Sequence, residues 1–126
     1  MRIVQVIPEL NEGGVERGVV ELNREFVKKG IESFVISAGG KLENQINLDG
    51  GNHVKFDVCS KNIFTAFRRV KGLKKILKEI NPDIIHVRSR VPAWLVYFAN
   101  KRLNIKVVST VHGFNSVGFY SSIMQK

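Results

Sequence analysis

The sequence predicts an α/β fold in which a mainly parallel sheet carries helices on both of its faces. Short runs rich in β-branched residues, typical of buried strands, alternate with longer segments whose apolar residues recur every three or four positions. The order of these segments is β-α-β-β-α-β-α-β-α. Because strands that follow one another through helices are joined by right-handed crossovers and lie parallel, this order favours a single twisted sheet.

Five short segments have the composition of strands. The first begins at Arg2 and stops at Pro8, and a glycine pair follows the second. Lys55 and Asp57 interrupt the third, which we therefore expect near an edge of the sheet. The predicted strands span residues 2–7, 33–37, 53–58, 83–87 and 105–111.

Two long amphipathic segments lie between these strands. In the first, which runs from Val15 to a stop at Gly30, the apolar residues share one helical face. The second spans residues 63–80 and ends before Pro82, because the residue preceding a proline avoids the helical conformation. Its predicted apolar stripe comprises Phe64, Phe67, Val70, Leu73, Leu77 and Ile80.

The last third of the chain adds two more predicted helices. Residues 92–103 form a helix with Pro92 in its first turn, where proline is well tolerated. We expect Trp94 in that helix to be largely buried against the sheet. Residues 117–124 are predicted to begin a final helix.

Charge and composition bound the class of protein. The chain of 126 residues is long enough for one domain, and its net charge of +9 suits nucleic acid, an anionic membrane surface or a phosphorylated substrate. The single cysteine, Cys59, excludes an intramolecular disulfide. The apolar runs are too short for a signal peptide or a membrane span. These features predict a cytoplasmic protein.

Ligands of parallel α/β sheets bind at the carboxyl ends of the strands, so the loops that follow the strands are the place to search for a site. The first such loop places Gly13-Gly14 at the start of a helix, where free N–H groups and the helix dipole attract phosphate. This pair is not part of a dinucleotide-binding or P-loop motif. Glu16, in the first helical turn, either stabilises the helix start or contacts a ligand.

The loops after the fourth and fifth strands carry further candidates. Arg88 and Arg90 follow a buried strand and suit either a phosphate ligand or surface ion pairs, whereas His86 in the same strand suits the core. His112, followed by Gly113, stands where the fifth strand ends, so its imidazole is the candidate catalytic group. The sequence contains no Asp-x-Asp pair and no zinc-ligand spacing, so we expect neither a metal nor a cofactor.

Three motifs in order resemble those of family 4 glycosyltransferases, which have the GT-B fold. Residues 13–16 resemble the family's G-G-x-E element after the first strand. Residues 82–94, PDIIHVRSRVPAW, are similar to a stretch of the bacterial branch that builds lipopolysaccharide and capsule, and residues 109–114 match its T-x-H-G-aromatic loop. The tail at 119–124 resembles the helix that precedes the last strand of the family's N-terminal domain.

This resemblance implies two Rossmann-like domains that face each other across a cleft. The C-terminal domain holds the nucleotide sugar with an E-x7-E motif, and the N-terminal domain binds the acceptor. The Gly13-Gly14 loop approaches the donor diphosphate and His112 lies near the transferred sugar. Transfer proceeds with retention of configuration and without a metal. Residues 1–126 then form the acceptor-side domain, incomplete at its C-terminal end and without the donor-binding domain, so we do not expect catalysis by this chain alone.

The implied function is therefore hexosyl-type transfer from a nucleotide sugar to a cell-envelope glycan or lipid-linked acceptor. A basic helix face suits peripheral contact with the anionic inner leaflet of the cytoplasmic membrane; it comprises Arg68, Lys71, Lys75 and Lys78. Two alternatives remain open. In the first, the chain is another phosphate-binding α/β domain, such as a sugar-nucleotide epimerase half or a regulator. In the second, it is a basic nucleic-acid-binding module. The second is less favoured, because base-reading and base-stacking motifs are absent from the sequence.

Overall fold

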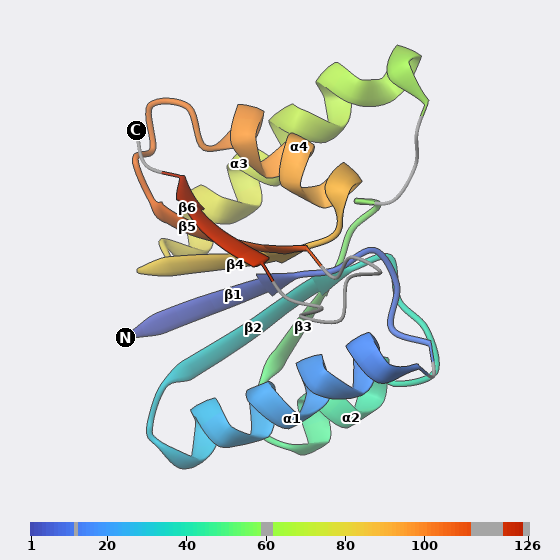
Figure 1. Ribbon diagram of the computed structural model, residues 1–126, viewed down its shortest axis with the longest axis vertical. Coiled ribbons are helices and arrows are strands. Elements are labelled where there is room, and N and C mark those ends of the chain that lie inside the picture. The colour runs from blue at the N-terminus through green and yellow to red at the C-terminus, as the bar shows by residue number, and fades with distance from the viewer. Residues whose placement is uncertain (12, 59–61, 112–119, 125–126) are drawn as a thin grey trace.

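A computed structural model of the protein describes residues 1–11, 13–58, 62–111 and 120–124. Its centre is a six-stranded sheet with the order β3-β2-β1-β4-β5-β6 (Figure 1). Strands β1 to β5 are parallel, and β6 is antiparallel to β5. The strands are β1 (Arg2–Val6), β2 (Glu32–Ser37), β3 (Asn52–Lys55), β4 (Ile84–Arg88), β5 (Lys106–Val111) and β6 (Tyr120–Met124).

Helices cover both faces of the sheet (Figure 1). The pair α1 (Gly14–Lys28) and α2 (Glu43–Leu48) lies on one face, and the pair α3 (Ala66–Ile80) and α4 (Arg90–Ala99) lies on the other. A short 3-10 turn, η1 (Ile63–Thr65), precedes α3. No helix in the described ranges is long and apolar enough to cross a bilayer.

The alternation of side chains along each strand divides the core into two layers. In the central strand β1, Val4 and Val6 pack toward α3 and α4, where they join Leu73, Leu77 and other residues in the larger cluster. A smaller cluster under α1 and α2 contains Val19, Val35 and Ile46. Both layers are fully buried, which fixes the positions of the strand ends that carry the candidate site.

The predicted fold class and all five predicted strands are confirmed, and the third strand does lie at an edge of the sheet. The short helix α2 was not predicted, since the segment between β2 and β3 shows only a turn signal in the sequence. The predicted final helix at residues 117–124 is wrong, because β6 occupies residues 120–124 and pairs with β5 from Val107 to Val111. A short isolated helix is marginal, whereas the open edge of β5 offers a full row of hydrogen-bonding groups.

The predicted burial of three aromatic side chains is also wrong. Phe64 and Phe67 are 90% and 86% exposed, and Trp94 is 52% exposed. Residues 63–65 form the 3-10 turn η1 rather than part of the α-helix, so Phe64 lies outside the apolar stripe. Together with the first turn of α3, η1 stands away from the sheet. Arg69 takes the inward position there: its Nη2 donates to the Asn62 carbonyl at 2.6 Å and its Nε donates to Thr65 Oγ1 at 3.1 Å.

Candidate functional site

The first part of the candidate site is the start of α1, directly after the carboxyl end of β1. Gly13 is the residue before the helix, and its carbonyl accepts the first helical hydrogen bond, from Arg17 N–H at 3.0 Å. The N–H groups of the first turn therefore have no partners within the helix. Gly14 is exposed, and no atom lies within 4 Å of the position that a Cβ would take there. The start of α1 is thus open to an anionic ligand.

Glu16 lies against this helix start. A Cβ built on Gly13 would collide with the Glu16 carboxylate, so the carboxylate occupies the space that the glycine leaves. A carboxylate at this place stabilises the positive end of the helix dipole by about 0.3–1 kcal/mol. The same side chain is only half-buried and remains within reach of a ligand at Gly14. Both predicted roles of Glu16 are compatible with this geometry.

Arg88 is the second component, and it belongs to the face of the sheet that α1 covers. Along β4, Ile85 and Val87 point into the core under α3 and α4, so the alternating positions Ile84, His86 and Arg88 face the other way. The Arg88 side chain is 7% exposed, and its Nη1 lies 4.0 Å from the position of a Cβ on Gly18. Burial lowers the pKa of Arg88 from its ordinary value, yet a guanidinium stays charged in proteins.

Ser89 and Arg90 form the crossing from β4 to α4. Ser89 has φ 98° and ψ 155°, a backbone conformation that glycine adopts readily and other residues adopt at a cost of about 1–3 kcal/mol. Arg90 is exposed and opens α4 on the opposite face of the sheet from α1. The strained residue therefore separates two arginines that leave the sheet in different directions. Nothing in the sequence indicates this strain.

The third component, His112 with Gly113, lies outside the described residues. The strand that leads to it is described, and Thr110 in β5 is the register partner of Arg88 in β4. The structure thus brings Gly13, Gly14, Glu16 and Arg88 to α1 and its side of the sheet. Arg90 is the first residue of α4, which lies on the other face of the sheet and begins at the same carboxyl edge.

A polar cluster that the sequence did not predict stands beside the edge strand β3. His53 Nε2 and Ser37 Oγ lie 2.6 Å apart, and Gly39 N–H donates to the same hydroxyl oxygen at 3.0 Å. His53 Nδ1 faces a Glu43 carboxylate oxygen at 3.9 Å. Burial lowers the pKa of His53, partly offset by the nearby Glu43.

The cluster combines the side chains of a hydrolytic triad, but it lacks the geometry of one. Ser37 is fully buried, and 3.9 Å is too long for a hydrogen bond between Glu43 and the imidazole. The contacts instead tie the end of β2 to β3 and to the start of α2. We therefore assign a structural role to Ser37, Glu43 and His53.

Residues 12–126 match the protein family described as Glycosyltransferase Family 4. The chain is 32% identical over 88 residues to the GalNAc-α-(1→4)-GalNAc-α-(1→3)-diNAcBac-PP-undecaprenol α-1,4-N-acetyl-D-galactosaminyltransferase of Campylobacter jejuni, which covers 67% of this chain and 24% of that protein. It is 31% identical over 118 residues to the UDP-N-acetylglucosamine–N-acetylmuramyl-(pentapeptide) pyrophosphoryl-undecaprenol N-acetylglucosamine transferase of Lactobacillus helveticus, which covers 91% of this chain and 30% of that protein.

A solved structure agrees with these relatives. The glycosyltransferase from Rickettsia africae superposes with a TM-score of 0.76 at 35% identity, over 92% of this chain and 31% of that chain. The present chain thus spans about a quarter to a third of the length of the proteins that it matches.

These matches decide between the interpretations that the sequence left open. Both curated relatives are named as sugar transferases, and the family match extends over nearly the whole chain. Two UDP-N-acetylglucosamine 2-epimerase structures also resemble the chain, but at 12% and 13% identity they show the fold alone. The chain therefore belongs to glycosyltransferase family 4, and its fold is that of the N-terminal, Rossmann-like half of the GT-B architecture.

Proposed function

We propose that this chain is the acceptor-side half of a retaining transferase, which moves a hexosyl-type sugar from a nucleotide-sugar donor to a cell-envelope glycan or lipid-linked acceptor. The observation that carries the proposal is the open start of α1 at Gly14, with the buried guanidinium of Arg88 beside the same helix. Two relatives are named for undecaprenol-linked compounds. This favours a polyprenyl-linked acceptor, used in building lipopolysaccharide or capsule.

In this proposal the start of α1 receives the diphosphate of the donor. The unpartnered N–H groups after Gly13 and the positive end of the helix dipole favour an anion there, and the missing side chain at Gly14 lets it approach closely. Arg88 and Arg90 supply the positive charge that a departing nucleoside diphosphate needs. Because these groups stabilise the leaving diphosphate, the proposed reaction requires neither a metal nor a cofactor.

His112 and Gly113 complete the site on the acceptor side. The imidazole of His112 holds a hydroxyl of the transferring sugar, and Gly113 permits the close approach of backbone to ligand. Glu16 accepts a hydrogen bond from a hydroxyl group of the ligand. The donor nucleotide itself binds to a second, C-terminal half, and the reacting atoms meet between the two halves.

The proposed place of action is the cytoplasmic face of the membrane that presents the lipid-linked acceptor. The basic side chains predicted to make peripheral contact with anionic lipid are all exposed on α3; they are Arg68, Lys71, Lys75 and Lys78. A basic residue near an anionic surface contributes about 1 kcal/mol.

The direct test is a sugar-transfer assay in which this protein is joined to a donor-binding half, with nucleotide-sugar donors and undecaprenyl-linked acceptors. His112→Ala is expected to lower kcat/KM by about 10²–10⁴ if the ring contacts the reacting sugar in the transition state. A value within twofold of the unchanged protein would remove His112 from the site. Transfer at a normal rate by residues 1–126 alone would contradict the proposal that donor and acceptor bind to different halves of the enzyme. Loss of activity in EDTA would contradict a metal-free reaction.

A further inference from the structure

Two glycines form the turn that follows β2. Gly39 and Gly40 have φ angles of 105° and 152°, conformations that glycine adopts far more readily than other residues. A Cβ on Gly40 would collide with the carbonyl group of Leu10, in the loop after β1. The glycine turn therefore lies directly against the segment that leads from β1 to the start of α1.

Backbone hydrogen bonds join the glycine turn to this segment. Leu10 takes part with both of its backbone groups: its N–H donates to the Gly39 carbonyl at 3.0 Å, and its carbonyl accepts from Leu42 N–H at 2.7 Å. Closer to the strands, Ala38 N–H donates to the Pro8 carbonyl at 2.9 Å. The Leu10 side chain is fully buried in the smaller cluster under α1 and α2. A movement of the glycine turn would therefore be passed to the segment that precedes α1.

Two side chains hold the glycine turn, one on each glycine N–H group. Ser37 Oγ accepts a hydrogen bond from Gly39 N–H at 3.0 Å, and Glu43 Oε1 accepts one from Gly40 N–H at 3.3 Å. The imidazole of His53 faces both of these side chains. Its Nε2 lies 2.6 Å from Ser37 Oγ, and its Nδ1 lies 3.9 Å from Glu43 Oε2. One buried ring thus adjoins both groups that hold the turn.

The neutral form of the ring satisfies these contacts. Ser37 is fully buried, and among the described residues the acceptor within reach of its hydroxyl hydrogen is Nε2 of His53. The hydrogen of the neutral ring then lies on Nδ1, toward Glu43. Protonation adds a hydrogen to Nε2, so the ring can no longer accept from Ser37, and the new charge attracts the Glu43 carboxylate. The same proton therefore disturbs both side chains that hold the glycine turn.

The surroundings of the ring keep it neutral at physiological pH. Burial lowers the pKa of His53, the carboxylate of Glu43 raises it, and the ammonium group of Lys55 lowers it, with a lowered pKa as the result. These are the charged groups that face the ring, from α2 and from β3, and β2 contributes only the uncharged Ser37. The ring consequently gains its proton below the ordinary value of 6.5.

We infer that His53 is a positioning residue for the start of α1, where the anion binds. Its neutral imidazole holds the glycine turn, and the turn holds Leu10 and the loop that leads to Gly14. This rests on the proposed function, in which the diphosphate of the donor lies at that helix start. Protonation of His53 releases the turn and weakens the binding of the anion.

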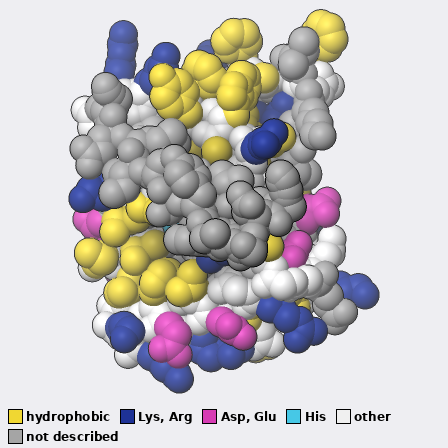
Figure 2. Space-filling model, in the orientation of Figure 1, with side chains coloured by type: hydrophobic (Ala, Val, Ile, Leu, Met, Phe, Trp, Pro, Cys, Tyr) yellow, Lys and Arg dark blue, Asp and Glu magenta, His cyan; other side chains and the backbone are white. Residues whose placement is uncertain are grey.

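The direction of this effect separates positioning from general electrostatics. The chain has a net charge of +9, and Lys and Arg side chains lie over both helical layers (Figure 2). Protonation of any histidine adds to this charge, and long-range attraction alone then strengthens anion binding as the pH falls. Positioning by His53 acts in the opposite direction.

Titration calorimetry of the full chain with inorganic pyrophosphate, at pH 7.5 and 5.0, tests the inference. Pyrophosphate itself gains protons in this range, so proteins are compared at the same pH. His53→Gln offers an amide oxygen to Ser37 and does not titrate. We expect it to match the unchanged protein at pH 7.5 and to bind at least about fivefold more tightly than the unchanged protein at pH 5.0, as in other couplings between sites. His53→Leu lacks the acceptor and should bind at least about fivefold more weakly than His53→Gln at both pH values.

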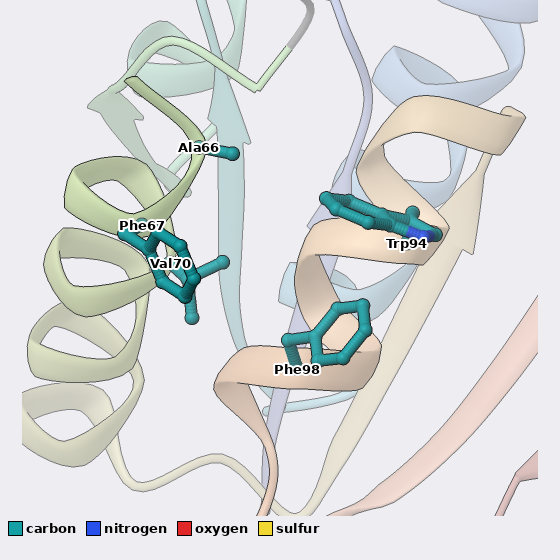
Figure 3. A pocket seen from close by; sticks show the side chains of 5 residues that line it. All are labelled: Ala66, Phe67, Val70, Trp94 and Phe98. Carbon is teal, nitrogen blue, oxygen red and sulfur yellow. The ribbon is translucent and has the colours of Figure 1, made fainter. Parts of the chain in front are cut away.

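Two control variants change side chains away from the glycine turn. Asn52→Ala alters an exposed residue at the other end of β3. Phe67→Ser alters a side chain of the apolar groove between α3 and α4, on the opposite face of the sheet (Figure 3). Both should bind pyrophosphate as the unchanged protein does at each pH. Circular dichroism at pH 7.5 and 5.0 checks that every variant is folded.

The amide resonances of Leu10 and Gly14 provide a readout that needs no ligand. In NMR spectra of the unchanged protein both should shift as His53 is protonated, and in His53→Gln they should not. Such shifts without any pyrophosphate binding would support the coupling and contradict the proposed place of the diphosphate.

The opposite result would leave the proposed function standing. Pyrophosphate binding that is lost in Gly14→Val, yet has the same pH dependence in His53→Gln as in the unchanged protein, would overturn the inference. Equal affinities of folded His53→Leu and His53→Gln would overturn it as well.

Discussion

The guanidinium group of Arg88 reaches from the last residue of β4 to the second turn of α1, where Gly18 leaves room for it. Its Nη1 lies 4.0 Å from the position of a Cβ on that glycine, which is an ordinary van der Waals distance. A strand end and a helix that are far apart in the sequence thus lie side by side at this point. The positive charge of Arg88 and the open start of α1 consequently act on the same side of the sheet.

This relationship predicts opposite outcomes for two substitutions of Gly18. Gly18→Ala adds only the Cβ, which meets no close contact, and should stabilise the domain by up to about 1 kcal/mol because alanine favours a helix interior. Gly18→Phe should instead push the guanidinium aside and weaken the binding of pyrophosphate. Urea unfolding and calorimetric titration measure the two effects. Equal pyrophosphate binding by both variants would show that the position of Arg88 does not matter.

Substitutions of Gly14 are expected to change ligand binding without changing the stability of the fold. Since no atom lies within 4 Å of a Cβ at this position, Gly14→Val should leave the free energy of unfolding within about 0.5 kcal/mol, as for other surface substitutions. The branched side chain should still block a phosphate from the first N–H groups of α1. We expect pyrophosphate binding to weaken markedly with Gly14→Val and less with Gly14→Ala. Unchanged binding in the valine variant would place the anion elsewhere.

His53 predicts a loss of stability on acidification. Burial holds its pKa below the ordinary value of 6.5, and Glu43 offsets this only in part. Because the folded pKa is lower than the unfolded one, the contribution of His53 is complete above about pH 6.5 and is lost as the pH falls through the folded pKa. Urea unfolding at pH 7.5 and 5.0 measures this difference. In His53→Gln, which has no group that titrates in this range, the pH dependence should become shallower; an unchanged slope would assign it to other groups.

Trp94 and Leu95 are neighbours on α4 with different surroundings. The tryptophan is half exposed, so Trp94→Ala should cost roughly 1–2 kcal/mol rather than the 3–5 kcal/mol of a large aromatic in a core. Leu95 is fully buried, and Leu95→Ala should cost about 2–5 kcal/mol. Denaturant unfolding compares the two variants directly. A larger loss for Trp94→Ala than for Leu95→Ala would show that the apolar groove between α3 and α4, which Trp94 lines, is closed in solution.

The strained backbone at Ser89 predicts a stabilising substitution. With φ at 98°, Ser89→Gly should relieve part of a strain of about 1–3 kcal/mol and raise the free energy of unfolding by about 1 kcal/mol, after the greater freedom of glycine in the unfolded chain is subtracted. The matched variant Ser89→Ala keeps the Cβ and should not stabilise the domain. If both variants stabilise equally, the serine hydroxyl rather than the backbone is responsible.

The elements that were predictable from the sequence are those whose own residues decide their structure. The runs at β1 and β4 are apolar and short, and the period of α1 is unambiguous, so their places in the sheet followed. Phe67 shows the limit of periodicity: it continues the apolar stripe of α3, but the turn that carries it extends past the surface on which it would pack. Tertiary position, which no local pattern contains, decided its exposure.

The candidate site was predictable to a similar extent. Gly14 and Arg88 were expected at the carboxyl edge because parallel strands share one direction. The position of the Arg88 side chain beside Gly18 was not predictable, because it depends on how closely α1 approaches β4. Ser89 gave no signal because its side chain is ordinary and only its backbone is unusual. The cluster of Ser37 and His53 was missed for a related reason, as each of the two residues lies within an unremarkable strand.

The hydrogen bonds of Arg69 to Asn62 and Thr65 bear on how fast the exposed turn with Phe64 and Phe67 can engage a partner. They hold η1 against α3, so that Phe64 and Phe67 stand in water in a fixed arrangement before any encounter. The ordering of this turn is therefore completed when the domain folds, and a contact made through it requires no further loss of backbone freedom. An interaction through such a rigid projection proceeds at the rate of collision and alignment, without a slow conformational step.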